Sequence, residues 1–141
     1  MKKILIVNSN YYKNISNNLV NNVKKKFNST NYLLSKIDVP GVFEIPIAIR
    51  KNIKKFDAFI ALGCVIKGQT PHFNLICTST FNSISGLSIN FNKPIGNGII
   101  TALNMSQAIN RSINKIKKSP NKGSEAANAV ISILENEPKK I

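Results

Sequence analysis

The feature that most constrains the fold is the stretch FDAFIALGCV at residues 56–65, in which almost every side chain is apolar. A strand that is buried on both faces has this pattern, whereas a strand with one wet face alternates polar and apolar residues. Burial on both faces requires a layer of helices on each side of the sheet. The run therefore predicts a central strand of a parallel sheet inside an α/β domain.

The rest of the chain supplies the partners that this strand needs. Shorter apolar runs predict further strands at residues 3–8, 32–39 and 94–101. Apolar residues at helical spacing predict helices over about 15–27 with Asn14 as N-cap, 45–54, 73–91, 105–116 and a last segment after Asn121. Strand and helix alternate four times, so we expect a three-layer α/β/α sandwich with a four-stranded parallel sheet and right-handed crossovers.

Length and patterning place limits on the class of protein. With 141 residues, one hydrophobic core can hold the fold without disulfides or metals, and we expect a single domain over residues 1–141. The apolar runs are far shorter than the ~20 residues of a membrane span, and residues 8–10 interrupt the first run before a signal sequence is complete. Cys64 and Cys77 form no metal-binding or disulfide pattern, so we expect two buried thiols in a cytoplasmic protein.

The formal net charge of +14 comes from 20 Lys and Arg residues against six Asp and Glu residues. Such a charge can attract nucleic acid or an anionic membrane surface. The lysines, however, lie in short scattered runs such as residues 24–26 and 54–55, without an RNA-binding aromatic pattern or a helix-turn-helix. We expect mainly a solvated surface, with a field that also attracts small anionic substrates, and no nucleic-acid or membrane partner.

Ligands of parallel sheets bind at the carboxyl ends of the strands, so the loops after residues 8, 39, 65 and 100 are the places to search. In the loop at 66–71, Gly68 permits a tight turn and the N–H groups of Gln69 and Thr70 suit a phosphate. His72 follows as the only histidine of the chain. An imidazole there can transfer protons near neutral pH, or it can simply pack at the start of a helix.

Three more groups have both a chemical and a structural interpretation. The turn VPGVFEIP at residues 39–46 can present Phe43 and Glu44 to a ligand, or it is a connector with an acid at a helix start. Tyr11 and its neighbour can offer a flat face to a heteroaromatic ring, or they are ordinary loop tyrosines. Arg111 can bind a phosphate through its guanidinium, or it is a solvated helix residue. The residues alone leave these alternatives open.

Four segments taken together closely resemble one family, the lumazine synthases: VPGVFEIP (39–46), ALGCVIKGQTPHF (61–73), PIGNGIIT (94–101) and NKGSEAA (121–127). The resemblance covers nearly the whole chain, in order. It implies a flavodoxin-like fold and the penultimate reaction of riboflavin biosynthesis. In that reaction 5-amino-6-(D-ribitylamino)uracil and 3,4-dihydroxy-2-butanone 4-phosphate condense to 6,7-dimethyl-8-ribityllumazine and phosphate, with neither a metal nor an organic cofactor.

The resemblance also implies roles for individual residues of one subunit. The ribitylaminouracil is expected to contact Tyr11, which stands in place of a usual phenylalanine or tryptophan, together with Val42, Phe43, Glu44, Cys64, Val65 and Ile66. Glu44 is expected to meet the ribityl hydroxyls. Gln69 and Thr70 correspond to the positions that hold the phosphate of the butanone, and His72 corresponds to the proton-transfer residue.

A neighbouring subunit is implied to complete the site in a homopentamer. Arg111 corresponds to its phosphate-binding arginine, and Asn97 stands where many members carry an aromatic that covers the pyrimidine. Lys122 and Glu125 correspond to a lysine and an acid near the site. The connection at 116–120 is about three residues longer than in shell-forming members and carries two lysines and a proline, so we expect a free pentamer or a pair of pentamers. An exchanged leading strand is expected to be missing.

Two other classes of protein compete with this interpretation. A flavin- or lumazine-binding protein would keep the fold without turnover, but the intact His72 and Arg111 argue against the loss of activity. A hydrolase that uses Cys64 and His72 is disfavoured, because Cys64 ends an apolar run without the glycine-framed elbow of a nucleophile.

Overall fold

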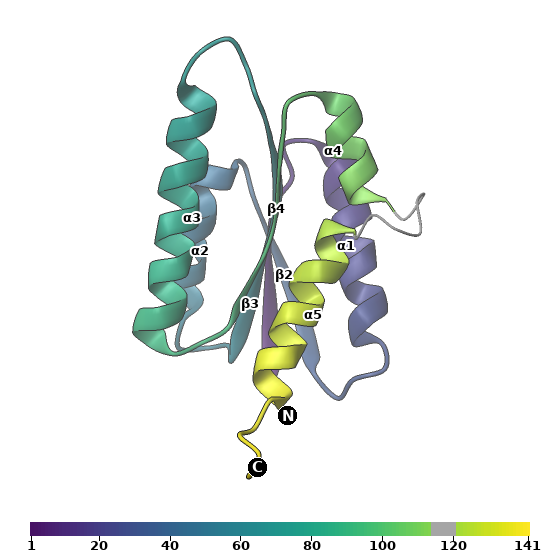
Figure 1. Cartoon of the computed structure of the whole chain (residues 1–141), viewed down its shortest axis with the longest axis vertical. Helices are drawn as coiled ribbons and strands as arrows, with labels where there is room; N and C mark the ends of the chain where they lie inside the picture. The colour runs from purple at the N-terminus through teal and green to yellow at the C-terminus, as the bar shows by residue number, and fades with distance from the viewer. Residues whose placement is uncertain (114–120) are drawn as a thin grey trace.

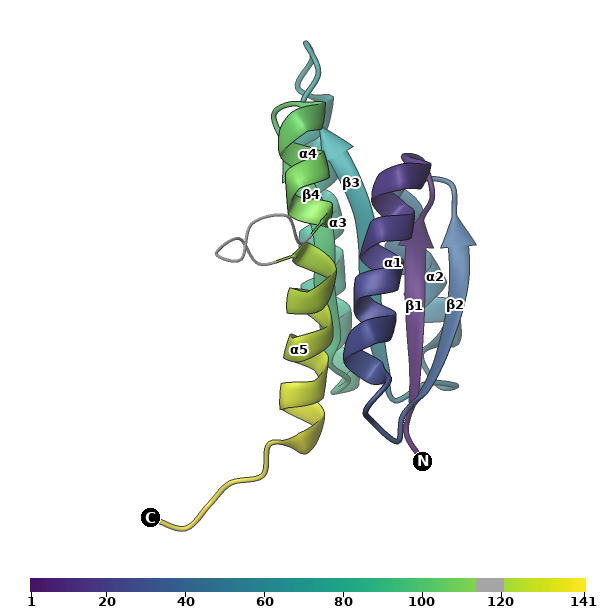
Figure 2. The ribbon, with the colours of Figure 1, turned by 90° about the vertical axis from the view of Figure 1, so that its right-hand side faces the viewer.

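The computed structural model describes residues 1–113 and 121–141. In this part of the chain, the parallel strands β1 (Lys3–Ser9), β2 (Leu33–Val39), β3 (Ala58–Ile66) and β4 (Ile95–Ala102) form one sheet in the order β2-β1-β3-β4. Helices α2 (Ile45–Asn52) and α3 (His72–Phe91) cover one face of the sheet (Figure 1). Helices α1 (Lys13–Phe27), α4 (Met105–Ser112) and α5 (Lys122–Glu135) cover the other face (Figure 2). The predicted three-layer α/β/α sandwich is confirmed.

The core lies in two layers, one on each side of the sheet. Along β3, Ala58, Ile60, Leu62 and Cys64 pack toward the α1, α4 and α5 side, whereas Phe59 and Ala61 pack toward α2 and α3. Every side chain from Ala58 to Cys64 is buried, which explains why the apolar run shows no alternation. By contrast, β2 forms an edge of the sheet, and its side chains are exposed or half-buried throughout.

The structure corrects one expected helix start and confirms another. Asn14 was expected to cap α1, but the helix begins at Lys13, and the N-cap residue Tyr12 makes no side-chain hydrogen bond. The carbonyl of Tyr12 already accepts the N–H of Ser16 at 2.9 Å, so Asn14 lies inside the first turn. At α5, the Asn121 side chain accepts the N–H groups of Gly123 and Ser124 at 2.9 and 3.1 Å, which is a regular N-cap.

The helix expected over 105–116 is shorter than its apolar pattern indicates. Helix α4 ends at Ser112, and Ile113 has extended backbone angles. The Ser112 carbonyl, at the end of this helix, accepts the side-chain N–H of Asn121 at 2.6 Å. Ile116 and the connection at 116–120 lie outside the described residues.

Most of the described basic residues lie at the end of the sheet where the strands begin and the helices end. They are Lys2, Lys3, Lys24, Lys25, Lys26, Arg50, Lys51, Lys54, Lys55, Lys93, Lys139 and Lys140. We call this end of the molecule the basic edge. The carbonyl ends of helices favour cations, which stabilises lysines at this edge. In residues 1–113 and 121–141, the side-chain ion pairs are Lys36–Asp38 and Lys122–Glu125, so the lysines of this basic edge have no carboxylate partner. No described helix is both long and apolar enough to cross a membrane.

Close contact between α5 and β4 depends on Gly96. A Cβ atom at this position would overlap the carbonyl oxygen of Ala126 and lie 2.9 Å from the Val130 side chain. We predict that Gly96→Ala lowers the free energy of unfolding by about 1–3 kcal/mol, because the helix backbone must move away from the sheet. Urea unfolding followed by circular dichroism measures this loss.

Gly86, in α3, provides the matched control, because no atom lies within 4 Å of a Cβ built there. Gly86→Ala should leave the free energy of unfolding unchanged or raise it by up to about 1 kcal/mol, since alanine favours a helix. Equal unfolding midpoints for Gly96→Ala and the wild-type chain would contradict the packing constraint.

Candidate active site

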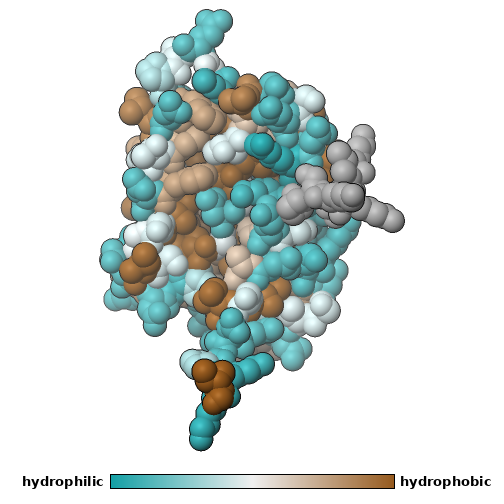
Figure 3. Space-filling view, in the orientation of Figure 1, coloured by the Kyte–Doolittle hydropathy of each residue, from teal (hydrophilic) through white to brown (hydrophobic). Residues whose placement is uncertain are grey.

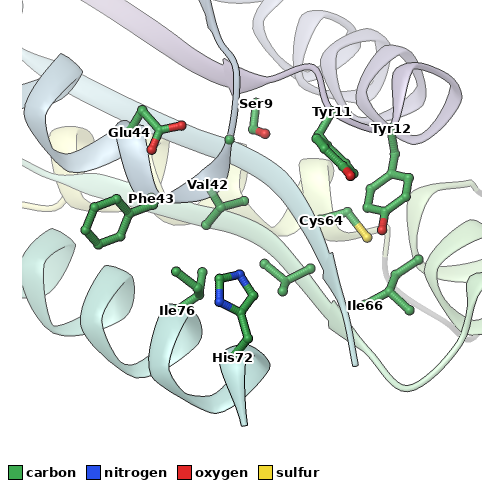
Figure 4. A pocket seen from close by; sticks show the side chains of 12 residues that line it. Ser9, Tyr11, Tyr12, Val42, Phe43, Glu44, Cys64, Ile66, His72 and Ile76 are labelled. Atoms are coloured by element: carbon green, nitrogen blue, oxygen red, sulfur yellow. The ribbon is translucent and has the colours of Figure 1, made fainter. Parts of the chain in front are cut away.

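The carboxyl ends of β1, β2 and β3 open onto a cavity of about 460 Å³ (Figure 4). In the order β2-β1-β3-β4, the chain turns back between β1 and β3, which is the switch point where open parallel sheets bind ligands. Four segments supply the walls: Ser9 at the end of β1 with Tyr11 and Tyr12 just after it, Gly41 to Glu44 after β2, Cys64 to Ile66 at the end of β3, and His72 and Ile76 on α3. We call this space the main cavity.

The floor of the main cavity requires a glycine at position 63. A Cβ at Gly63 would lie 2.8 Å from a methyl group of Val42 and 3.0 Å from the Cβ of Ser9. The absence of a side chain therefore lets β1, β3 and the short 3₁₀ helix Val42–Glu44 approach one another closely. This close contact fixes the position of the 3₁₀ helix, and therefore of its residues Phe43 and Glu44.

A buried polar network holds the loop that carries Tyr11. The side chains of Asn8 and Ser16 exchange hydrogen bonds of 2.7 and 2.9 Å, and the Asn8 amide also donates to Asp38 at 2.9 Å. Lys36 pairs with Asp38 at 2.8 Å, and the hydrogen bonds from Lys36 and then Asn8 lower the pKa of Asp38. The network joins β1, α1 and β2 directly beneath the loop.

Aromatic rings stand on opposite sides of the main cavity. Tyr11 is 72% exposed and meets the ring of Tyr12 edge-on, with 4.9 Å between ring centroids. Phe43 is exposed on the far side, beside the half-buried Glu44. Figure 4 shows the His72 imidazole pointing into the space between them from the first turn of α3. A flat ligand can therefore stack on Tyr11 while a carboxylate and an imidazole reach its polar atoms.

The two cysteines differ in their surroundings. Cys64 is buried in the wall of the main cavity, and burial raises the pKa of its thiol to about 11. The thiol is therefore neutral at pH 7 and contributes packing rather than a nucleophile. Cys77 is only half-buried, so the expectation of two buried thiols is correct for Cys64 and wrong for Cys77, where partial burial also raises the pKa.

Not all of the predicted site residues line the main cavity. Gln69 and Thr70 lie exposed in the loop after β3, outside the lining, and α3 begins just beyond them with Pro71 as N-cap. Asn97 is half-buried on β4, where its side-chain oxygen accepts the N–H of Ile99 at 3.0 Å. Asn97 does not line the main cavity, nor the second cavity described next.

Arg111 and Lys122 meet at a second cavity of about 270 Å³ beside the edge strand β4. Arg111 donates a 2.7 Å hydrogen bond to the carbonyl of Thr101, and Lys122 lies 4.0 Å from the Glu125 carboxylate. Phe81 on α3 and Ile99 and Ile100 on β4 complete the walls. Within one chain, Arg111 and Lys122 therefore line a basic cavity that is separate from the main cavity, and Gln69, Thr70 and Asn97 line neither.

Two residues of the main cavity did not stand out in the sequence. Ile76 lies one helical turn after His72, so the spacing of four residues could have indicated that both face the same space. Ser9 ends the first buried strand, and a polar residue at the carboxyl end of such a strand is the only local indication of its place in the wall.

The fold and the main cavity together define a class of protein. A cavity with aromatic and apolar walls, a few converging polar groups and a place at the switch point of a parallel sheet is typical of α/β enzymes with small-molecule substrates.

Comparison with known proteins narrows this class to one family. The family model for 6,7-dimethyl-8-ribityllumazine synthase matches residues 1–137. A 6,7-dimethyl-8-ribityllumazine synthase of Campylobacter jejuni is 40% identical over 137 residues, covering 94% of this chain and 87% of the relative. Those of Aliarcobacter butzleri and Sphingopyxis alaskensis are 36% and 35% identical, with 95% of this chain and 87% and 94% of the relatives covered. The chain belongs to the 6,7-dimethyl-8-ribityllumazine synthase family.

Proposed function

We propose that this chain is a transferase that condenses 5-amino-6-(D-ribitylamino)uracil with 3,4-dihydroxy-2-butanone 4-phosphate. The products are 6,7-dimethyl-8-ribityllumazine and phosphate, in the penultimate step of riboflavin biosynthesis. The match of the family over residues 1–137 carries this proposal. Mixing the purified protein with both substrates tests it directly: the lumazine chromophore should appear, and binding without turnover would instead favour a lumazine-binding protein.

The chemistry fits the polar groups of the main cavity. An amine of the uracil attacks the carbonyl of the butanone and water leaves, phosphate is then eliminated, and the second amine closes the ring with loss of water. Each step moves protons, which the His72 imidazole can accept and return. The reaction joins two substrates, so much of the acceleration comes from holding them side by side. We propose that no metal or organic cofactor takes part.

We assign the ribitylaminouracil to the main cavity. Its ring stacks on Tyr11, and its ribityl hydroxyls donate hydrogen bonds to the Glu44 carboxylate. The remaining contacts are apolar packing and backbone hydrogen bonds from Val42, Phe43, Cys64, Val65 and Ile66. The exposed aromatic faces of Tyr11 and Phe43 on opposite walls support this assignment.

We assign the phosphate of the butanone to a site shared by two subunits. The N–H groups of Gln69 and Thr70 face it from one subunit, and Arg111 of the neighbouring subunit supplies a fixed positive charge. Asn97 and Lys122 of the neighbour lie near the substrates. The separation of the main cavity from the basic cavity within one chain supports this division.

A shared site requires a homo-oligomer, and we propose a cytoplasmic homopentamer. Figure 3 shows apolar side chains gathered over the region of α3 and the edge strand β4. Exposed large apolar residues on the helices include Leu75 and Ile89 on α3, Met105 and Ile109 on α4, and Ile133 on α5. Contact between subunits would remove this apolar surface from water.

A Cys-His hydrolase remains disfavoured. The Cys64 thiol has a pKa of about 11, so at pH 7 only about one thiol in 10⁴ is ionised. Burial of the thiol is the cause of this raised pKa.

His72→Ala should lower kcat by roughly 10- to 10²-fold, the lower part of the range for loss of a proton-transfer group, because substrate proximity is retained. His72 is exposed, so the melting temperature should not change. Steady-state formation of the lumazine chromophore measures kcat. Wild-type turnover in this variant would exclude His72 as the proton-transfer residue.

Arg111→Ala should chiefly raise the KM for the butanone phosphate, by roughly 10- to 10²-fold, because a charge-assisted bidentate contact is lost. Arg111→Lys should restore only part of the affinity, since lysine cannot form the bidentate fork. Initial rates with each substrate varied in turn provide both KM values. A change confined to the KM for the ribitylaminouracil would contradict this role.

Light scattering in moderate salt should give the mass of five chains, or of ten if two rings associate. A mass on the order of a megadalton would indicate a shell of twelve pentamers and contradict the free ring. An active monomer would contradict the shared site itself. The measurement is best repeated at several salt concentrations, because like charges on adjacent subunits are screened by ions.

A further inference from the structure

Ser9 carries a buried hydroxyl group that has no hydrogen-bond partner. The residue is 2% exposed, and among residues 1–113 and 121–141 only Ser9 and Thr80 have a buried side-chain oxygen in this condition. Buried polar groups in native proteins nearly always have a partner, because a hydroxyl removed from water without one is destabilising. We therefore expect the Ser9 hydroxyl to form a hydrogen bond with a molecule that binds from outside the chain.

The position of Ser9 identifies where that partner binds. Leu5 and Val7 pack into the core toward α2 and α3, and Ser9 is the next residue on the same face of β1. It stands where the apolar core ends and the main cavity begins, and it is one of the lining residues (Figure 4). Beside it, Gly63 has no side chain, and a Cβ there would lie 3.0 Å from the Cβ of Ser9.

The main cavity also holds the phenol hydroxyls of Tyr11 and Tyr12, but Ser9 is the lining residue whose hydroxyl group is buried without a hydrogen-bond partner among the described residues. Glu44 is an acceptor when it is ionised, whereas a serine hydroxyl both donates and accepts. The ring of a pyrimidinedione carries carbonyl oxygens and N–H groups, and a ribityl chain carries hydroxyls, so this substrate can supply the missing partner. Gln69 and Thr70, assigned to phosphate, lie outside the lining, so the butanone phosphate is the less suitable partner.

We propose that the Ser9 hydroxyl forms a hydrogen bond to the ribitylaminouracil and so helps to hold this substrate at the floor of the main cavity. This inference rests on the proposed function. It makes Ser9 a substrate-binding residue, and it predicts an unusual combination of effects. Removal of the hydroxyl should weaken binding of the substrate without destabilising the ligand-free protein.

The experiment compares Ser9→Ala with the wild-type chain and with Thr80→Val. Ser9→Ala should raise the KM for the ribitylaminouracil about 3- to 10-fold, the effect of one neutral hydrogen bond, and leave the KM for the butanone phosphate unchanged. The melting temperature of the ligand-free variant should be equal to or above that of the wild type, because an unpartnered hydroxyl has been removed.

Thr80→Val is the matched control because Thr80 is 1% exposed and carries the other unpartnered hydroxyl. Thr80 lies on α3 beside another cavity of about 330 Å³, which shares Phe43 and Glu44 with the main cavity, but Thr80 itself does not line the main cavity. Valine has nearly the same shape, so the melting temperature should again stay equal or rise, while both KM values remain those of the wild type.

Three results have distinct meanings. Unchanged KM values in Ser9→Ala, with normal turnover by the wild-type chain, would overturn the role of Ser9 and leave the proposed function intact. A lower melting temperature together with weaker binding of both substrates would show that the hydroxyl stabilises the fold, which also overturns the inference. Absence of turnover by the wild-type chain would contradict the proposed function, and direct titration of ribitylaminouracil into both proteins would then test the contact by itself.

Discussion

The burial of β3 on both faces governs the rest of this molecule. Every residue from Ala58 to Cys64 is buried, so helices must cover this part of the strand on both faces. Strands joined by such helices run parallel, and each helix then starts at the edge where the strands end. The turn after β2, the loop after β1 and the first turn of α3 meet at that edge as a result. The main cavity follows from the topology, and the side chains in its walls determine what it binds.

Local patterns in the sequence were sufficient for the layers of the fold. The strands were predicted from short continuous apolar runs, because strands of a covered parallel sheet are buried on both faces, and the helices from apolar residues at helical spacing. The end of α4 was not predictable in this way. It coincides with a hydrogen bond from Asn121 to the Ser112 carbonyl, nine residues away and across the undescribed part of the chain. Asn14 failed as a cap for a similar reason, because the chain leaving β1 enters its first helical turn earlier.

The residues of the candidate site also fall into two groups: those that local sequence patterns predicted and those that only the structure identified. Tyr11, Glu44 and His72 were singled out by residue type and loop position, and the structure brings them around one cavity. The residues alone did not indicate that Arg111 lies apart from that cavity, beside the edge strand β4; only the resemblance to the family implied it, by assigning Arg111 to a neighbouring subunit. Ser9 was missed because serine at the end of a strand is common. Only its burial, its place on the core-facing side and its lack of a partner distinguish it.

The basic edge has a consequence for how this protein tolerates mutation. Helix ends accept lysine at little energetic cost, and this edge is formed by the ends of α1, α2, α3 and α5. The main cavity lies at the opposite end of the strands, where its walls include Tyr11, Glu44 and His72. A lysine added at the basic edge therefore places its charge far from the main cavity. The parallel topology gives the molecule one end that tolerates added positive charge and another that holds the cavity.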